Sequence, residues 1–105
     1  MEQFEKDALK MAKDPSYTYS DFEKELGEAG YRLFSQGMTD AGLYILKIVT
    51  KAYPESSGAW YSLASAQEQV QQFKEAKENY QKTIALNPNS IIANTATKRL
   101  VKLAQ

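Results

Sequence analysis

Apolar residues recur every three or four positions along most of this chain, in blocks separated by short polar connections. This period places them on one face of a helix. The blocks predict helices over residues 21–36, 39–52, 57–69, 73–86 and 91–104, and a short amphipathic helix over residues 2–13. The pattern therefore predicts an all-α fold built from antiparallel helix pairs.

Residues that start and stop helices lie where these blocks meet. Ser20 with Glu23 three positions later forms a capping-box pattern, and Thr39-Asp40 and Ser90 are good N-caps for the next helices. Gly37 can end a helix because glycine adopts the left-handed conformation that follows many helices. These signals fix the expected ends of the helices.

The helical pattern also repeats itself at a fixed offset. Pro54 precedes Pro88 by 34 residues. The same offset joins these further pairs: Leu26 with Trp60, Ala29 with Leu63, Gly30 with Ala64, Gly42 with Ala76, and Leu46 with Tyr80. Agreement in residue type at one period predicts two copies of a helix–turn–helix unit, each stacking on the other.

The stretch Ser57–Ser90 resembles a tetratricopeptide repeat. The residues that carry the resemblance are Trp60, Leu63, Ala64, Ala76, Tyr80 and Pro88. The resemblance implies an α-solenoid fragment with the following parts: an N-terminal helix and linker over 1–19, a divergent first repeat over 20–56, a second repeat over 57–90 and a C-terminal capping helix over 91–105.

The repeat pattern also predicts how individual residues pack. The small residues of each repeat should lie where its two helices cross, since a bulky side chain there would overpack the contact. Trp60 is expected to be a main anchor of the core. Gln71 stands where the family pattern has glycine, and Gly27 has no evident packing reason.

Composition narrows the class of protein. The 105 residues suffice for one small domain, and the 13 basic and 13 acidic residues cancel, which gives no argument for nucleic-acid or membrane binding. Residues 2–28 nevertheless hold eight acids and four lysines, while residues 80–105 hold four basic residues and no acid. This asymmetry is either two solvated faces or a head-to-tail attraction between chains.

The chain contains no Cys and no His, which removes the usual metal ligands, nucleophilic thiols and neutral-pH proton shuttles. It also contains no glycine-rich phosphate loop. We therefore expect no catalytic, metal or cofactor residues and no enzyme activity within these residues. No apolar run approaches transmembrane length, and a cytoplasmic location follows if Met1 is the natural start.

The family resemblance implies a concave groove lined by the first helix of each repeat. Its expected residues are Tyr31, Phe34, Tyr61, Ser65, Glu68, Gln69, Thr95 and Arg99. Aromatic rings with polar tips are common at recognition surfaces, so the expected partner is a protein or peptide. The alternative is that the N-terminal helix or an adjoining domain fills the groove. The carboxylate clamp that some tetratricopeptide proteins use for chaperone tails is missing, since its positions include Gly27 and Tyr31.

A narrower resemblance runs from Leu26 to Ser90. The motifs Gly30-Tyr31-Arg32-Leu33-Phe34, Tyr53-Pro54-Glu55-Ser56 and Tyr61-Ser62-Leu63-Ala64 are similar to C-terminal extensions of bacterial serine hydrolases. These are esterase-like α/β-hydrolases and β-lactamase-like enzymes. This resemblance implies an accessory domain that positions or oligomerises a catalytic domain located upstream. Association of copies of the chain is a third alternative, because two repeats fall below the roughly three that usually stack independently.

Overall fold

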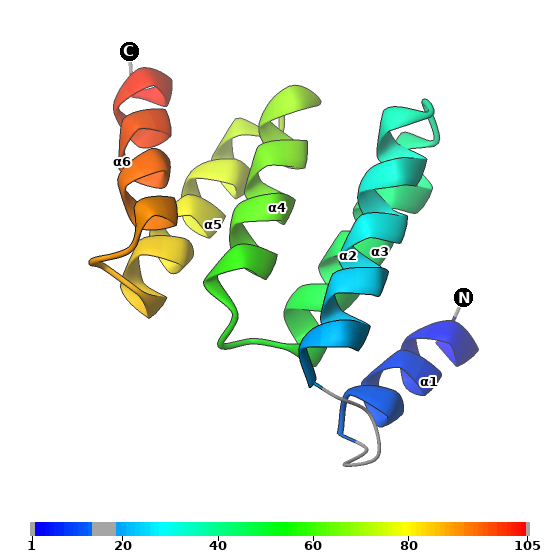
Figure 1. Cartoon of the computed structure of the whole chain (residues 1–105). Coiled ribbons are helices and arrows are strands. Elements are labelled where there is room, and N and C mark those ends of the chain that lie inside the picture. Colours follow the sequence, from blue (N-terminus) through cyan, green and yellow to red (C-terminus); the bar gives the residue numbers. More distant parts are fainter. Residues whose placement is uncertain (1, 14–18, 105) are drawn as a thin grey trace. The chain divides into compact units, whose positions relative to one another are not determined.

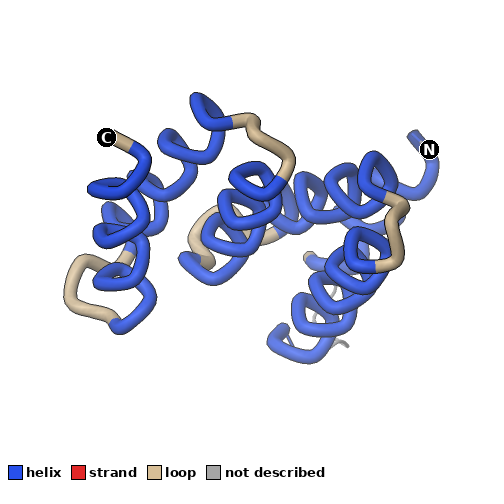
Figure 2. Tube along the Cα trace, turned by 90° about the horizontal axis from the view of Figure 1, so that it is seen from above, coloured by secondary structure: helices blue, strands red, loops and turns tan. Residues whose placement is uncertain are grey.

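The structure, a computed structural model, describes residues 2–13 and 19–104, with the side chains of residues 19–21 left out. Within these residues it contains six helices and no strand (Figure 1). Their bounds are α1 Glu2–Ala12, α2 Tyr19–Ser35, α3 Thr39–Ala52, α4 Ser57–Gln69, α5 Phe73–Leu86 and α6 Ile91–Leu103. Figure 2 shows that short connections join the helices from α2 to α6. The all-α prediction is confirmed.

The chain divides into two compact units, residues 1–54 and 55–105. In the first unit α2 packs against α3, and α1 lies against both. In the second unit α5 packs against both α4 and α6, and α4 also contacts α6. Each unit therefore contains one helix hairpin and one additional helix.

The hairpin of the first unit depends on two glycines. A Cβ atom added to Gly42 would lie 2.7 Å from the carbonyl oxygen of Gly30 and 2.7 Å from the backbone nitrogen of Phe34. A Cβ atom on Gly30 would lie 3.1–3.2 Å from side-chain atoms of Ile45 and Leu46. The backbones of α2 and α3 thus approach more closely at Gly42 than any side chain would allow, as the repeat pattern predicted.

Helix α3 is buried on more than one side. Leu46, Ile48 and Val49 are almost fully buried, because α2 and α1 both pack on this helix. At the surface, the ammonium of Lys51 donates a hydrogen bond of 2.6 Å to Glu5 of α1. This hydrogen bond and the negative charge of Glu5 raise the pKa of the Lys51 ammonium above its usual value.

The core of the second unit is built from small residues around one tyrosine. Ala64 of α4, Ala76 and Tyr80 of α5, and Ala96 of α6 form a buried cluster. Leu100 and three other half-buried side chains pack against it. Helix α6 therefore covers the apolar face of α5, as expected for a capping helix.

Trp60 does not have the role expected from the sequence. Its side chain is only half-buried, and the ammonium of Lys82 lies 5.7 Å from the centre of its ring. The largest fully buried side chains are instead those of Tyr53 and Tyr80. The prediction that Trp60 anchors the core of its unit is therefore wrong.

Of the three predicted helix caps, the one at Ser90 is confirmed, and those at Ser20 and Thr39-Asp40 are wrong. The hydroxyl oxygen of Ser90 accepts a hydrogen bond of 3.0 Å from the N–H of Ala93, which caps α6. Helix α2 begins at Tyr19, so Ser20 lies inside its first turn and not at the N-cap. Thr39 is the first residue of α3, and the N-cap residue, Met38, makes no side-chain cap. Ser56 supplies the cap of α4, at 3.3 Å from the N–H of Ala59.

Both hairpins turn in the same way. In the first, the N–H of Met38 donates to the carbonyl of Leu33, and that of Gly37 donates to Phe34. In the second, the equivalent bonds run from Gln72 to Gln67 at 2.9 Å and from Gln71 to Glu68 at 3.0 Å. This is the Schellman arrangement, in which the residue after the helix takes a positive φ. That angle is 88° at Gly37 and 66° at Gln71.

The close crossing predicts opposite effects of one substitution at two glycines. Gly42→Ala should lower the free energy of unfolding by about 2 kcal/mol, because the new methyl group meets backbone atoms that cannot move aside. Gly27→Ala is the matched control, since no atom lies within 4 Å of its added Cβ. It should raise the free energy of unfolding by about 0.5–1 kcal/mol through helix propensity. Urea unfolding of both variants tests this, and equal effects would contradict it.

The turn predicts that Gln71→Gly stabilises the protein. A non-glycine residue in the left-handed region costs about 1–2 kcal/mol, and glycine returns part of this through its greater freedom when unfolded. We expect a net gain of about 0.5–1 kcal/mol. Gly37→Ala at the equivalent turn should cost about 1 kcal/mol. Thermal unfolding measures both, and a destabilised Gln71→Gly variant would refute the strain at this turn.

Candidate functional site

A hydrogen-bonded network centred on Glu68 joins the three helices of the second unit. One carboxylate oxygen of Glu68 accepts a bond of 2.8 Å from the hydroxyl of Tyr80 and one of 3.0 Å from Nε of Arg99. The other oxygen accepts from a terminal nitrogen of the same guanidinium. Glu68 lies on α4, Tyr80 on α5 and Arg99 on α6.

This network is partly shielded from water. The exposed fraction of the side chain is 15% for Glu68 and 33% for Arg99. A two-point bond between guanidinium and carboxylate fixes the orientation of both groups, and reduced exposure lessens the screening of their attraction. The side chain of Arg99 thereby joins α6 to α4.

Aromatic side chains lie beside the network. The rings of Tyr61 and Tyr80 are tilted, with centroids 5.7 Å apart, a separation typical of favourable aromatic pairs. Tyr61 is half-buried and packs against the buried cluster. It therefore contributes to the core of the unit while part of its surface remains accessible.

The remaining predicted groove residues of this unit differ in exposure. Gln69 is exposed at the end of α4, whereas Ser65 is half-buried one turn earlier. Thr95 is half-buried, and its hydroxyl donates to the carbonyl of Ile91 at 3.1 Å. These three side chains lie on the same two helices, α4 and α6, as Glu68 and Arg99.

Two of the predicted groove residues belong to the first unit. Tyr31 and Phe34 lie one turn apart on α2, with ring centroids 6.1 Å apart, and both are half-buried. They form an aromatic pair of their own. A single groove containing all eight residues remains a prediction, because six of them belong to the second unit.

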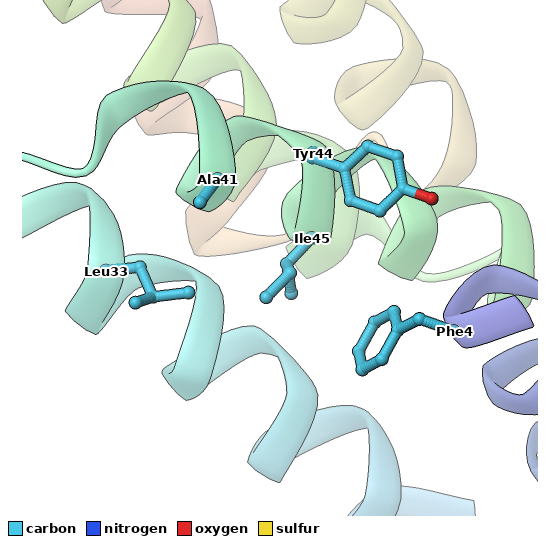
Figure 3. Close-up of a pocket in the computed structure, with 5 residues that line it drawn as sticks. All are labelled: Phe4, Leu33, Ala41, Tyr44 and Ile45. Atoms are coloured by element: carbon cyan, nitrogen blue, oxygen red, sulfur yellow. The ribbon is translucent and has the colours of Figure 1, made fainter. Parts of the chain in front are cut away.

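An apolar hollow of about 240 Å³ lies in the first unit and was not predicted from the sequence. It is lined by Phe4 of α1, Leu33 of α2, and Ala41, Tyr44 and Ile45 of α3 (Figure 3). Phe4 is 43% exposed at its edge. A signal for it was present in the repeat register, since the second repeat carries polar residues at all four of the positions that α2 and α3 contribute.

The comparisons with known proteins bear on the second unit. The model of the tetratricopeptide repeat family matches residues 57–90. The matched range covers α4 and α5 and ends at the N-cap of α6. A search of curated proteins found no match. Together with the helical fold, the family match supports a tetratricopeptide-repeat protein.

A tetratricopeptide repeat mediates protein interactions in general and is usually a non-catalytic scaffold, which fits a chain that is not an enzyme. Across residues 2–13 and 19–104, no three His, Cys, Asp or Glu side chains are grouped so as to hold a metal ion. In the same part of the chain no helix combines the length and apolar character needed to cross a membrane.

The network predicts an energetic coupling between Glu68 and Arg99. In a double-mutant cycle with Glu68→Gln and Arg99→Gln, we expect a coupling of about 1 kcal/mol, the upper end for pairs that water partly screens. Chemical unfolding measures it. Lys98→Gln is the matched control, because Lys98 is the exposed neighbour of Arg99 on α6. Its effect should stay within about 0.5 kcal/mol, and a coupling near zero would show that the pair does not stabilise the unit.

Proposed function

We propose that this chain is a non-catalytic protein-interaction module that binds a peptide or helix through the second unit. The proposed binding surface comprises the following side chains of α4 and α6: Tyr61, Ser65, Glu68, Gln69, Thr95 and Arg99. The match of residues 57–90 to the tetratricopeptide repeat supports an interaction role in general. The choice of these residues rests on their arrangement in this unit.

The observation that carries the proposal is the fixed network of Glu68, Tyr80 and Arg99. Its polar groups are already oriented by one another, so a partner that hydrogen-bonds to them would not have to order long side chains. Tyr61 adds a half-buried ring beside the charges. Arginine and tyrosine are enriched at protein interfaces because they offer large contact areas with polar ends.

The aromatic pair Tyr31 and Phe34 is proposed as a separate contact of the first unit. Both rings are half-buried, so each keeps accessible surface while its packing limits its motion. A partner long enough to reach both units could use this pair in addition to the surface on α4 and α6. Avidity of this kind raises affinity without any new type of contact.

A second candidate function is that of an accessory domain of a serine hydrolase. It is supported by the sequence motifs of Leu26–Ser90 that are similar to extensions of such enzymes. In that case the partner is a catalytic domain in the same polypeptide. The mass of the chain in its source cells separates the two candidates, because a fused hydrolase would add a catalytic domain of roughly 250 residues.

The proposal predicts that one bulky substitution blocks peptide binding. Random 12-residue peptides selected by display on the purified protein would be measured by fluorescence anisotropy. Ser65→Arg places a long charged side chain in the middle of the proposed surface on α4 and should weaken binding at least about tenfold. Gln81→Arg, at an exposed position on α5, is the matched control and should leave binding unchanged.

Tyr61→Ala is a poor probe of this surface. Its ring packs against the buried cluster, so truncation would also lower the stability of the unit. Peptides that bind Ser65→Arg as tightly as the unaltered protein would overturn the proposed surface, and so would a failure to select any peptide.

A further inference from the structure

The residues of α2 and α3 that line the hollow of the first unit have polar counterparts in the second repeat. At the 34-residue offset, Leu33 corresponds to Gln67 and Ile45 to Asn79, and these two polar side chains hydrogen-bond to each other at 2.6 Å. Ala41 and Tyr44 likewise correspond to Glu75 and Glu78. The same face is therefore polar in one repeat and apolar in the other. An apolar face of this kind is typical of a surface that another element covers.

Helix α1 covers this face only in part. Phe4 reaches its edge, yet the hollow of about 240 Å³ remains, and Phe4 itself is 43% exposed (Figure 3). The remaining space is large enough for one branched aliphatic side chain and its neighbours. The first unit therefore offers a concave, apolar contact bounded by helices.

Exposed apolar side chains that could fill this hollow lie on α6. Ile91 is 84% exposed and Val101 is 58% exposed, and Lys98 lies between them on the same side of the helix. At the repeat offset Val101 corresponds to Gln67 of α4, which is 3% exposed and bonded to α5. On α4, helix α5 covers the face that carries Gln67. Val101 lies on the corresponding face of α6. Helix α6 is the last helix that the structure describes.

We propose that these two surfaces bind each other between copies of the chain. The α6 stripe, defined as Ile91, Lys98, Val101 and Lys102, contacts the hollow of a second copy, and an apolar side chain of the stripe enters it. This association goes beyond the proposed function, because it uses residues outside the peptide-binding surface. The association removes the exposed apolar side chains of α6 and the apolar lining of the hollow from water, which is favourable.

The charges favour a second copy as the occupant. Residues 80–105 contain four basic residues and no acid, while residues 2–28, which include α1, contain eight acids and four lysines. Asp40 is exposed directly before Ala41 of the hollow, and Asp7 is exposed on α1. Lys98 and Lys102 of the stripe would therefore approach these two carboxylates in the second copy, which adds attraction to the apolar contact.

The same charges make the contact head-to-tail. Two α6 stripes facing each other would bring Lys98 and Lys102 of both copies together, and like charges across an interface are unfavourable. Two hollows facing each other would leave their volume empty. The stripe of one copy against the hollow of another avoids both costs and is a heterologous contact in the sense of oligomer symmetry.

Sedimentation velocity of the full chain over a range of concentrations tests the proposal. We expect reversible association below about 1 mM protein, weakened when salt is raised from about 0.05 M to 0.5 M. Val101→Asp should weaken it at least about tenfold by placing a charge in the apolar contact. Gln81→Asp adds the same charge at an exposed site on α5 and is the matched control.

A mixing experiment distinguishes this contact from any other mode of association. Ala41→Glu blocks the hollow but leaves the stripe intact, and glutamate is well tolerated in the first turn of a helix. Val101→Asp leaves the hollow intact. Each variant alone should be monomeric. Their mixture should form a 1:1 dimer by native mass spectrometry, because the intact stripe of one variant can bind the intact hollow of the other. Circular dichroism confirms that both variants fold.

Three outcomes would overturn the proposal. The unaltered chain could remain monomeric at about 1 mM. It could associate equally well when it carries Val101→Asp. The two variants could also fail to combine although both are folded. None of these outcomes affects the peptide-binding surface, which is tested separately by Ser65→Arg.

Discussion

The close approach of two helix backbones at Gly30 and Gly42 is the constraint on which the first unit depends. No side chain fits between the Cα of Gly42 and the carbonyl of Gly30, so α2 and α3 can pack at this distance only with glycine there. The approach brings Leu33 and Ala41 to the same side of the hairpin, where the apolar hollow forms. Leu33 and Ala41, which line the hollow, are the sequence neighbours of Phe34 and Gly42 at this crossing.

In the second unit, alanine takes the place of these two glycines. Ala64 and Ala76 are fully buried at the equivalent positions, and Ala96 of α6 joins them. Because these residues are small, Tyr80 can lie within the unit and still direct its hydroxyl to Glu68. Glu68 in turn binds Arg99, so the apolar packing and the polar network hold the same three helices. Removing the small residues would therefore disturb both.

Periodicity was sufficient to predict the helices, because an apolar stripe determines both helix type and approximate length. The small residues at the crossings were also predictable, since they recur at the offset of the repeat. The cap at Ser20 was misplaced because a start signal identifies a helix only to within a turn. Trp60 was misjudged because size suggests burial, whereas burial depends on what the neighbouring helices can cover.

Contacts between helices distant in sequence were the part that a single sequence could not reveal. Glu68 and Arg99 are separated by 31 positions in the sequence. In the sequence alone, each residue is typical of a solvated charge on a helix surface. Only the packing of α6 beside α4 turns them into a pair. The hollow is different, because comparing Leu33 with Gln67 and Ile45 with Asn79 would have revealed an apolar face on one repeat alone. Divergence between repeats at matching positions therefore carries information that agreement between them does not. The agreeing positions specify how each hairpin packs, and the differing ones show where the surfaces of the two hairpins differ in polarity.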